Sequence, residues 1–298
     1  MKLFSLKMLL KRLVRVMSVV TLMSVSVISL QAYEGKHRGK TIIENRTSMG
    51  DGHIESFVRL NRHGKIKALG VLISEEVLES LPTEKNDGTT CWDSNEDGIL
   101  DRDTECAAGH VRILYLPKLA DLPFKYIQFN WQRDGHGPVG IYDKGHFDMH
   151  VFIQDNLDRL AIRPGPCPAI INCDDVLKAA KELPEEFVPV GMTYQMGGAG
   201  QAYMGGHMAD ESSQEWHGTP LTHAHTYGVY DGHVTFIEPL VNTEWLKTKP
   251  NECAPILQAP EVEVSGYYPK KFCTRFFERS NKYAMTMENF EYREALTN

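Results

Sequence analysis

The chain has 298 residues, 42% of them hydrophobic, and its 39 acidic residues outnumber 32 basic ones for a formal net charge of −7. This length and composition support a folded core and exclude a largely disordered protein. An acidic surface repels nucleic acid and anionic lipid, so neither is an expected partner, whereas metal cations suit its charge.

Residues 1–32 have the pattern of a secretory signal peptide. Five basic and no acidic residues precede or flank an apolar block at residues 16–30, and Ala32 is a small residue suited to cleavage. The block is short and rich in serine for a membrane span, although an uncleaved anchor is the alternative. Without this segment 27 basic residues face 39 acidic ones, a charge of −12. We therefore predict a secreted or periplasmic protein with no membrane insertion after cleavage.

The six cysteines fall into three pairs that are close in sequence. An even number of cysteines in an exported chain predicts disulfides, although six cysteines allow fifteen connectivities. No pair has the C-x-x-C spacing of a redox or zinc site, so a structural role is favoured. The expected pairs are Cys91 with Cys106, Cys167 with Cys173, and Cys253 with Cys273.

Short apolar runs rich in β-forming residues alternate with glycine and proline along the chain. This spacing predicts a mainly β protein, a single antiparallel β-sandwich or barrel with a few short helices, rather than parallel βαβ units. The expected strands lie at residues 53–60, 64–73, 110–117, 125–131, 146–153, 233–241 and 261–268.

Brief helical patterns occur at Glu75–Ser80, at Asp174–Glu182 with Asp174 as the N-cap, and in the tail from Asn281. The simplest organisation is a His-rich β domain at residues 33–249, followed by a disulfide-bridged C-terminal appendage at residues 250–298.

An Asp-Gly dipeptide at residues 231–232 lies between two alternating apolar runs and predicts a β-hairpin with a type I′ turn. Counting outward from the turn places His225 opposite Glu238, and alternation puts His223 on the same face. An imidazole and a carboxylate so placed could share a metal ion or a hydrogen bond. A one-residue bulge would break this register.

A loop insertion at residues 91–106 resembles an EF-hand calcium loop. Gly98 stands where the sharp turn needs it, but position 12 is Thr104, so Asp103 or Glu105 would have to supply the last carboxylate. We predict a weak structural calcium site, with a solvated acidic loop as the alternative. Its ligands would be Asp93, Asn95, Asp97, the Ile99 carbonyl and Asp101.

The run HFDMHVF places His146, Asp148 and His150 on one face of a strand and apolar residues on the other. Several imidazoles buried with carboxylates are hard to satisfy without a cation or a dense hydrogen-bond network, so we predict a transition-metal site. Zinc or another divalent transition metal suits these ligands. Further candidate ligands are His136, His207, His223, His225 and Glu238.

The motif W-x-x-x-G-H-x-P-x-G-x-Y-x-x-x-H-F-D-x-H, from Trp131 to His150, resembles the signature of an exported bacterial family of unknown function, the TTHB-type β domain. The resemblance spans residues 53–245. Within this range it also includes the element Met204–His207 and the closing stretch THAHTYGVYDG, which is followed by FIEP. It implies a compact secreted β domain, and it favours His223 over His225 as the candidate ligand because His223 falls on a motif position. It does not indicate a reaction. Motif positions fall on His136, His146, His150, His207, His223 and Glu238.

Three hypotheses compete. In an exported zinc-type hydrolase or lyase, three histidines hold the metal, and Asp148 or Glu238 acts as general base or orients a ligand histidine. A non-catalytic envelope protein would instead bind a metal or small molecule. In a structural protein the histidines would form a hydrogen-bonded core. Such a protein could assemble as a homo-oligomer. Nucleotide binding is not expected, because GGAGQAYMGG lacks the Lys-Ser/Thr ending of a phosphate loop.

Overall fold

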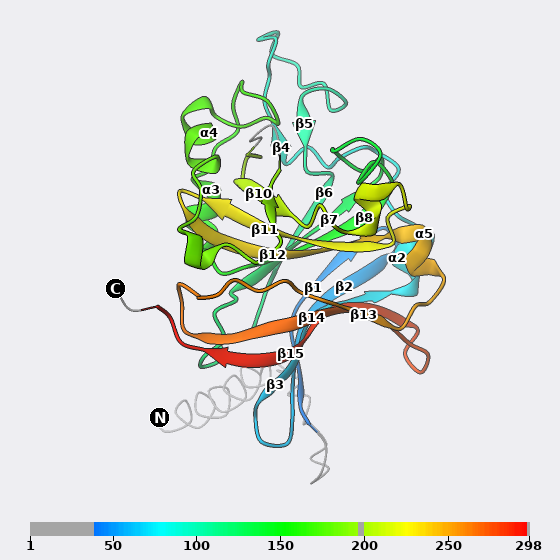
Figure 1. The fold of residues 1–298 in the computed structure, drawn as a ribbon. Coiled ribbons are helices and arrows are strands. Elements are labelled where there is room, and N and C mark those ends of the chain that lie inside the picture. The colour runs from blue at the N-terminus through cyan, green and yellow to red at the C-terminus, as the bar shows by residue number, and fades with distance from the viewer. Residues whose placement is uncertain (1–38, 196–199, 297–298) are drawn as a thin grey trace, which may run out of the picture. The chain divides into compact units, whose positions relative to one another are not determined.

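Two antiparallel sheets face each other in the computed structural model, which describes residues 39–195 and 200–296 (Figure 1). The predicted signal peptide lies outside the described residues. The first sheet has six strands in the order β1-β2-β3-β15-β14-β13. Its strands are β1 (Thr41–Met49), β2 (Gly52–Leu60), β3 (Ile66–Ser74), β13 (Glu252–Pro255), β14 (Gly266–Phe277) and β15 (Lys282–Arg293).

The second sheet has seven strands in the order β6-β7-β8-β12-β11-β10-β9. Its strands are β6 (His110–Tyr115), β7 (Tyr126–Gln132), β8 (His146–Phe152), β9 (Thr193–Tyr194), β10 (Gly206–Ala209), β11 (His223–Tyr230) and β12 (His233–Asn242). A small third sheet pairs β4 (Thr90–Cys91) with β5 (Cys106–Ala107). The prediction of a mainly β, antiparallel fold is confirmed.

Helices in the described residues are short and lie in the connections. They are α2 (Glu75–Glu79), α3 (Asn156–Leu160), α4 (Cys173–Ala179), α5 (Thr243–Lys247) and the 3₁₀ turns η1 (Glu185–Phe187) and η2 (Gln214–His217). Helix α4 begins one residue earlier than predicted, because Asn172 is its cap and accepts a hydrogen bond from the Asp174 N–H at 3.0 Å. None of the described helices has the length and apolarity that a bilayer crossing requires.

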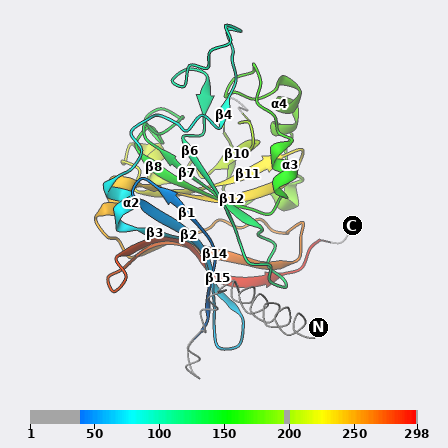
Figure 2. The ribbon, with the colours of Figure 1, turned by 180° about the vertical axis from the view of Figure 1, so that it is seen from behind.

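The C-terminal residues differ most from their prediction. The expected helix from Asn281 is wrong, because these residues form β15, which pairs with both β3 and β14. Strands β13, β14 and β15 therefore complete the first sheet instead of forming an appendage (Figure 2). Strand β15 buries Tyr283, Met285 and Met287 in the core, because alternate residues of a strand share one face. In a helix these three side chains would point in different directions.

The main core lies between the two sheets and fixes which face of β8 is polar. Phe147, Met149 and Val151 are fully buried in one cluster with Ile54 and Leu69 of the first sheet. Because strand side chains alternate, the other side chains of β8 project from the opposite face of the second sheet. Loops and helix α4 cover that face (Figure 1). The predicted alternation along this strand is confirmed.

All three predicted disulfides are present, with S–S distances of 1.95 Å, 2.11 Å and 2.15 Å. They tie down connections: the first closes the loop between β4 and β5, the second spans the turn before α4, and the third joins β13 to β14. Three disulfides are consistent with an oxidising, extracellular compartment.

Candidate metal centre

The outer face of β8 is polar and buried. His146, Asp148 and His150 are at most 1% exposed, in a position where an unpaired charge is costly. Neighbouring β7 presents an amide side chain opposite each of them: Gln132, Asn130 and Gln128. Sequence reasoning missed these amides, although polar residues at every second position of YIQFNWQ were a signal for a second polar strand face.

A first cluster comprises His136, His146 and Asp148. The two Nε2 atoms lie 3.1 Å apart, His146 Nε2 is 2.9 Å from Asp148 Oδ1, and His136 Nε2 is 3.6 Å from Asp148 Oδ2. Ligands held tetrahedrally at zinc distances of about 2.0–2.1 Å lie about 3.3 Å from one another. The two imidazole nitrogens and the carboxylate therefore have the mutual spacing of ligands to one ion, and this group could hold a metal.

Backbone carbonyls orient both imidazoles of the first cluster. His146 Nδ1 is 2.7 Å from the Lys144 carbonyl, and His136 Nδ1 is 2.8 Å from that of Gly137. Each Nδ1–H donates to its carbonyl, so the Nε2 atom of each ring is directed toward Asp148. Two imidazole nitrogens and a carboxylate that converge in this way require a proton or a metal cation between them.

Two further contacts position this cluster. Gln132 Nε2 donates to Asp148 Oδ2 at 3.0 Å, which fixes the orientation of the carboxylate. His136 comes from the loop between β7 and β8, where its N–H donates to the Tyr142 carbonyl at 2.9 Å. The close approach of the backbone at His136 to Tyr142 requires glycine at position 135. There φ is +67°, and a Cβ atom would lie 2.2 Å from the Tyr142 carbonyl oxygen.

A second cluster comprises His150, His207 and Glu238, which come from β8, β10 and β12. His150 Nε2 is 2.9 Å from Glu238 Oε1, and His207 Nε2 is 3.7 Å from Glu238 Oε2. The Gln128 carbonyl accepts from His150 Nδ1 at 3.1 Å, and the Thr226 hydroxyl donates to Glu238 Oε2. This group too could hold a metal.

Both clusters border one cavity of about 350 Å³. His136 and Asp148 reach its wall from the first cluster, and all three members of the second cluster line it. A third group of close ligand atoms, Cys253, Cys273 and Glu288, is excluded as a metal site because its two sulfurs form a disulfide. The cavity is therefore the candidate metal centre of the described residues.

The carboxylates of the cavity are ionised. Burial opposes the charge of Asp148, but His146 and His136 outweigh it and hold its pKa well below the usual value. In the same way His150 outweighs burial and lowers the pKa of Glu238. Burial likewise disfavours charged His136, yet Asp148 raises its pKa to about 9. The buried negative charges thus recruit positive charge from protons or from a metal ion.

Two histidines of the cavity differ in their surroundings. Burial disfavours the charged form of His150, but Glu238 outweighs this effect and raises the His150 pKa. His207 is farther from the carboxylate, so burial prevails and lowers its pKa to about 4. At neutral pH His207 is therefore an uncharged imidazole, which is the form that binds a metal.

A bulge removes two predicted residues from the site. Tyr230 lies opposite His233, as the predicted turn requires, but the register shifts between Gly228 and Val229. Thr226 therefore faces Glu238, and the predicted pairing of His225 with Glu238 is wrong. A shift of one residue turns every later side chain to the other face.

His223 and His225 consequently point away from the cavity, toward the first sheet. His225 Nε2 accepts from the Leu257 N–H at 3.0 Å, and the ring of His223 stacks on Trp245 with centroids 4.8 Å apart. The structure brings the other predicted ligands together in two clusters rather than one, and it brings His223 to neither. Thr226, which sequence reasoning missed, takes the position beside Glu238.

Several side-chain oxygens of the calcium-type loop accept hydrogen bonds from its own backbone, although the buried Oδ1 of Asp93 has no partner among the described residues. Asp93 Oδ2 accepts from the Gly98 N–H at 2.8 Å, and Asp97 Oδ1 accepts from the Ile99 N–H at 2.7 Å. Its Asp and Glu oxygens form no group of three close ligand atoms among the described residues. Two further predicted ligands have similar contacts: the Asn95 side chain accepts from the Asp97 N–H, and the Asp101 side chain accepts from the Asp103 N–H.

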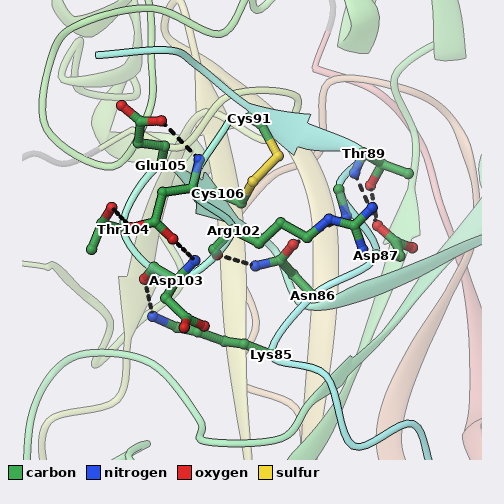
Figure 3. Close-up of a disulfide and its surroundings, with 12 residues drawn as sticks. Lys85, Asn86, Asp87, Thr89, Cys91, Arg102, Asp103, Thr104, Glu105 and Cys106 are labelled. Carbon is green, nitrogen blue, oxygen red and sulfur yellow. Dashed lines mark hydrogen bonds between the residues drawn. A yellow bond between two sulfur atoms is a disulfide. The ribbon is translucent and has the colours of Figure 1, made fainter. Parts of the chain in front are cut away.

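Residues around the loop hold its base in place (Figure 3). Glu105 accepts from the N–H groups of Ser94 and Asp101 at 2.8 Å and 3.0 Å. The Cys91–Cys106 disulfide closes the base, and Lys85 donates to the Asp103 carbonyl. Calcium binding by this loop stays a prediction.

Comparisons with protein-family models, curated proteins and solved structures give no match for this chain. The resemblance to the TTHB-type family therefore stays a prediction based on its motif residues. Functional inference must come from the geometry of the cavity.

Proposed function

We propose that this chain is an exported metal-dependent hydrolase in which the first cluster, His136, His146 and Asp148, holds a divalent transition metal. Two imidazoles and one carboxylate are ligands that zinc prefers. The observation that carries the proposal is the spacing of 2.9–3.6 Å among these ligand atoms beside a cavity of about 350 Å³.

The number of ligands favours catalysis over a purely structural metal. Structural zinc sites are closed by four protein ligands, whereas catalytic sites have three and leave a position for water or substrate. A zinc ion held in this way supplies a water molecule with a pKa of about 7 and polarises a substrate carbonyl or phosphoryl oxygen.

The residues of the chain would perform the remaining tasks. The carbonyls of Lys144 and Gly137 hold the two rings with Nε2 directed at the metal position. Gln132 keeps the Asp148 carboxylate from rotating away. Such supporting contacts set the geometry and affinity of metal ligands.

Elemental analysis tests this proposal. The mature chain is purified without chelator or metal-affinity tag, beside a His146→Ala variant and a His233→Ala control. His233 has a 71% exposed side chain and lies outside the cavity. We expect His146→Ala to lose one equivalent of metal and the control to lose none. Thermal unfolding of each variant shows whether it remains folded.

Turnover is then measured with chromogenic carboxylate and phosphate esters. Activity should disappear after dialysis against chelator and return when zinc is added. Retention of all metal by folded His146→Ala would overturn the assignment of the first cluster. Bound metal without activity toward either ester class would instead indicate a non-catalytic metal-binding protein. The presence of two ligand groups in one cavity also supports that alternative.

A further inference from the structure

We infer that the second cluster, His150, His207 and Glu238, binds a second divalent cation in the same cavity, and that the two ions together select a phosphate monoester as substrate. The choice of substrate rests on the proposed function. The presence of a second ion does not, because it follows from ligand geometry alone.

The two clusters are separate sets of ligand atoms, because the atoms within each set lie within 4.8 Å of one another and no single set joins them. Their histidines on β8, His146 and His150, are four residues apart, which is about 13 Å between Cα atoms at about 3.3 Å per residue. The carboxylates divide in the same way, since Asp148 lies beside His146 and Glu238 lies beside His150. Each cluster is thus a separate set of two imidazoles and one carboxylate.

The geometry around Glu238 suits a cation better than hydrogen bonds alone. One oxygen faces His150 at 2.9 Å, and the other faces His207 at 3.7 Å. The second distance exceeds a hydrogen bond, but it fits two ligands that each lie about 2.1 Å from one ion. The anchored Nδ1 of His150 and the hydroxyl of Thr226 support this arrangement.

The charge of the cavity identifies the ligand class. Asp148 and Glu238 are the only acidic residues among its described lining residues, and no lysine or arginine lines it. One divalent ion would neutralise the two carboxylates, whereas two ions leave a net charge of about +2. A phosphate monoester dianion balances that excess. Pro138, Met204 and Leu240 give the cavity an apolar part for the organic group.

The reaction inferred is hydrolysis. The oxygen of a water molecule bonds to phosphorus, the bond from phosphorus to the alcohol oxygen breaks, and a proton from the water passes to the alcohol. The products are inorganic phosphate and the alcohol, so no oxidant or reductant is required. Cations bound in the wall of the cavity would attract the anionic substrate and stabilise the charge that develops on its phosphoryl oxygens.

Metal stoichiometry tests the second site. Full-length mature protein is stripped with chelator and titrated with Zn²⁺ alone. We expect two equivalents in the wild type and one each in His146→Ala and Glu238→Gln. Thr226→Val retains every ligand and should weaken only the second equivalent about tenfold, as expected for a lost supporting contact. Thr274→Val is the control, because Thr274 lies on β14 of the first sheet and its buried hydroxyl has no hydrogen-bond partner among the described residues.

Binding of only one Zn²⁺ equivalent by the wild type would overturn the second site. Loss of the same equivalent, identified by its affinity, in both His146→Ala and Glu238→Gln would overturn it as well. Titration of the loaded proteins with inorganic phosphate tests the substrate class. Phosphate should bind the two-ion wild type at least tenfold more tightly than Glu238→Gln, and acetate should show no such difference. Equal phosphate affinities, or turnover of carboxylate esters alone, would overturn the phosphate assignment.

The failures of the two proposals are distinguishable. Two bound ions and tight phosphate binding without ester hydrolysis would leave the second site standing and overturn the hydrolase. Ester hydrolysis by a protein that binds one ion would overturn the second site and retain the hydrolase.

Discussion

Replacement of Gln132 by leucine tests whether the first cluster is organised as a metal site. Its amide donates to Asp148 Oδ2 at 3.0 Å and is 7% exposed. A hydrogen bond to a buried ionised acceptor contributes about 1.5–3 kcal/mol, which is about 10- to 100-fold in affinity. Loss of a partner that orients a metal ligand typically lowers metal affinity by the same 10- to 100-fold. We therefore expect Gln132→Leu to weaken the first-cluster ion by that factor.

Competition with a chromophoric zinc chelator measures the affinity of each equivalent. Asn130→Leu is the matched control, since Asn130 lies on the same strand, opposite Asp148, yet neither atom of its amide has a hydrogen-bond partner among the described residues. The control should keep wild-type metal affinity and lose no stability, because it removes an unsatisfied buried amide. Equal affinities for Gln132→Leu and Asn130→Leu would refute the idea that the amide orients the carboxylate for metal binding.

Three other predictions concern the fold around the site. Burial lowers the pKa of His225 to about 4, so the unfolded chain takes up this proton first. Protonation of His225 should therefore lower the free energy of unfolding by about 3 kcal/mol as the pH drops from 6.5 to 4. In urea unfolding the loss over this pH range should be smaller by that amount in His225→Gln than in the wild type. Gly228→Ala would place a Cβ atom 2.2 Å from the Phe236 ring, so we expect a loss of about 1–3 kcal/mol in urea unfolding. Glu105→Gln removes an acceptor of loop N–H groups and should speed proteolysis within residues 91–106, with unchanged cleavage contradicting this role.

Local patterns predicted much of the second sheet and named all six members of the two clusters as candidate ligands, but not their division into two sets. Alternation in HFDMHVF identified the buried polar face of β8 because adjacent side chains of a strand point in opposite directions. Strand β1 was missed, since TIIENRTSM is largely polar and mostly exposed at the edge of the first sheet. Strand β15 was missed because its pairing with β3 joins residues more than 200 positions apart, and no local pattern reports such a contact.

The division of the ligands into two sets depends on the β-bulge in the hairpin of β11 and β12, which the sequence alone does not predict. Thr235 is the extra residue of the bulge, because Gly228 pairs with Phe236 whereas Val229 pairs with Val234. Both registers bury apolar side chains, so periodicity alone cannot choose between them.

The choice is made by the carboxylate. With the bulge, Glu238 faces the cavity, where His150 from the neighbouring strand meets it at 2.9 Å. Without the bulge, Glu238 would share a face with His225, which lies against the apolar interface between the sheets. A buried carboxylate there would lack the partners that a charge requires. The same bulge thus removes His223 and His225 from the cavity and completes the second cluster with Glu238.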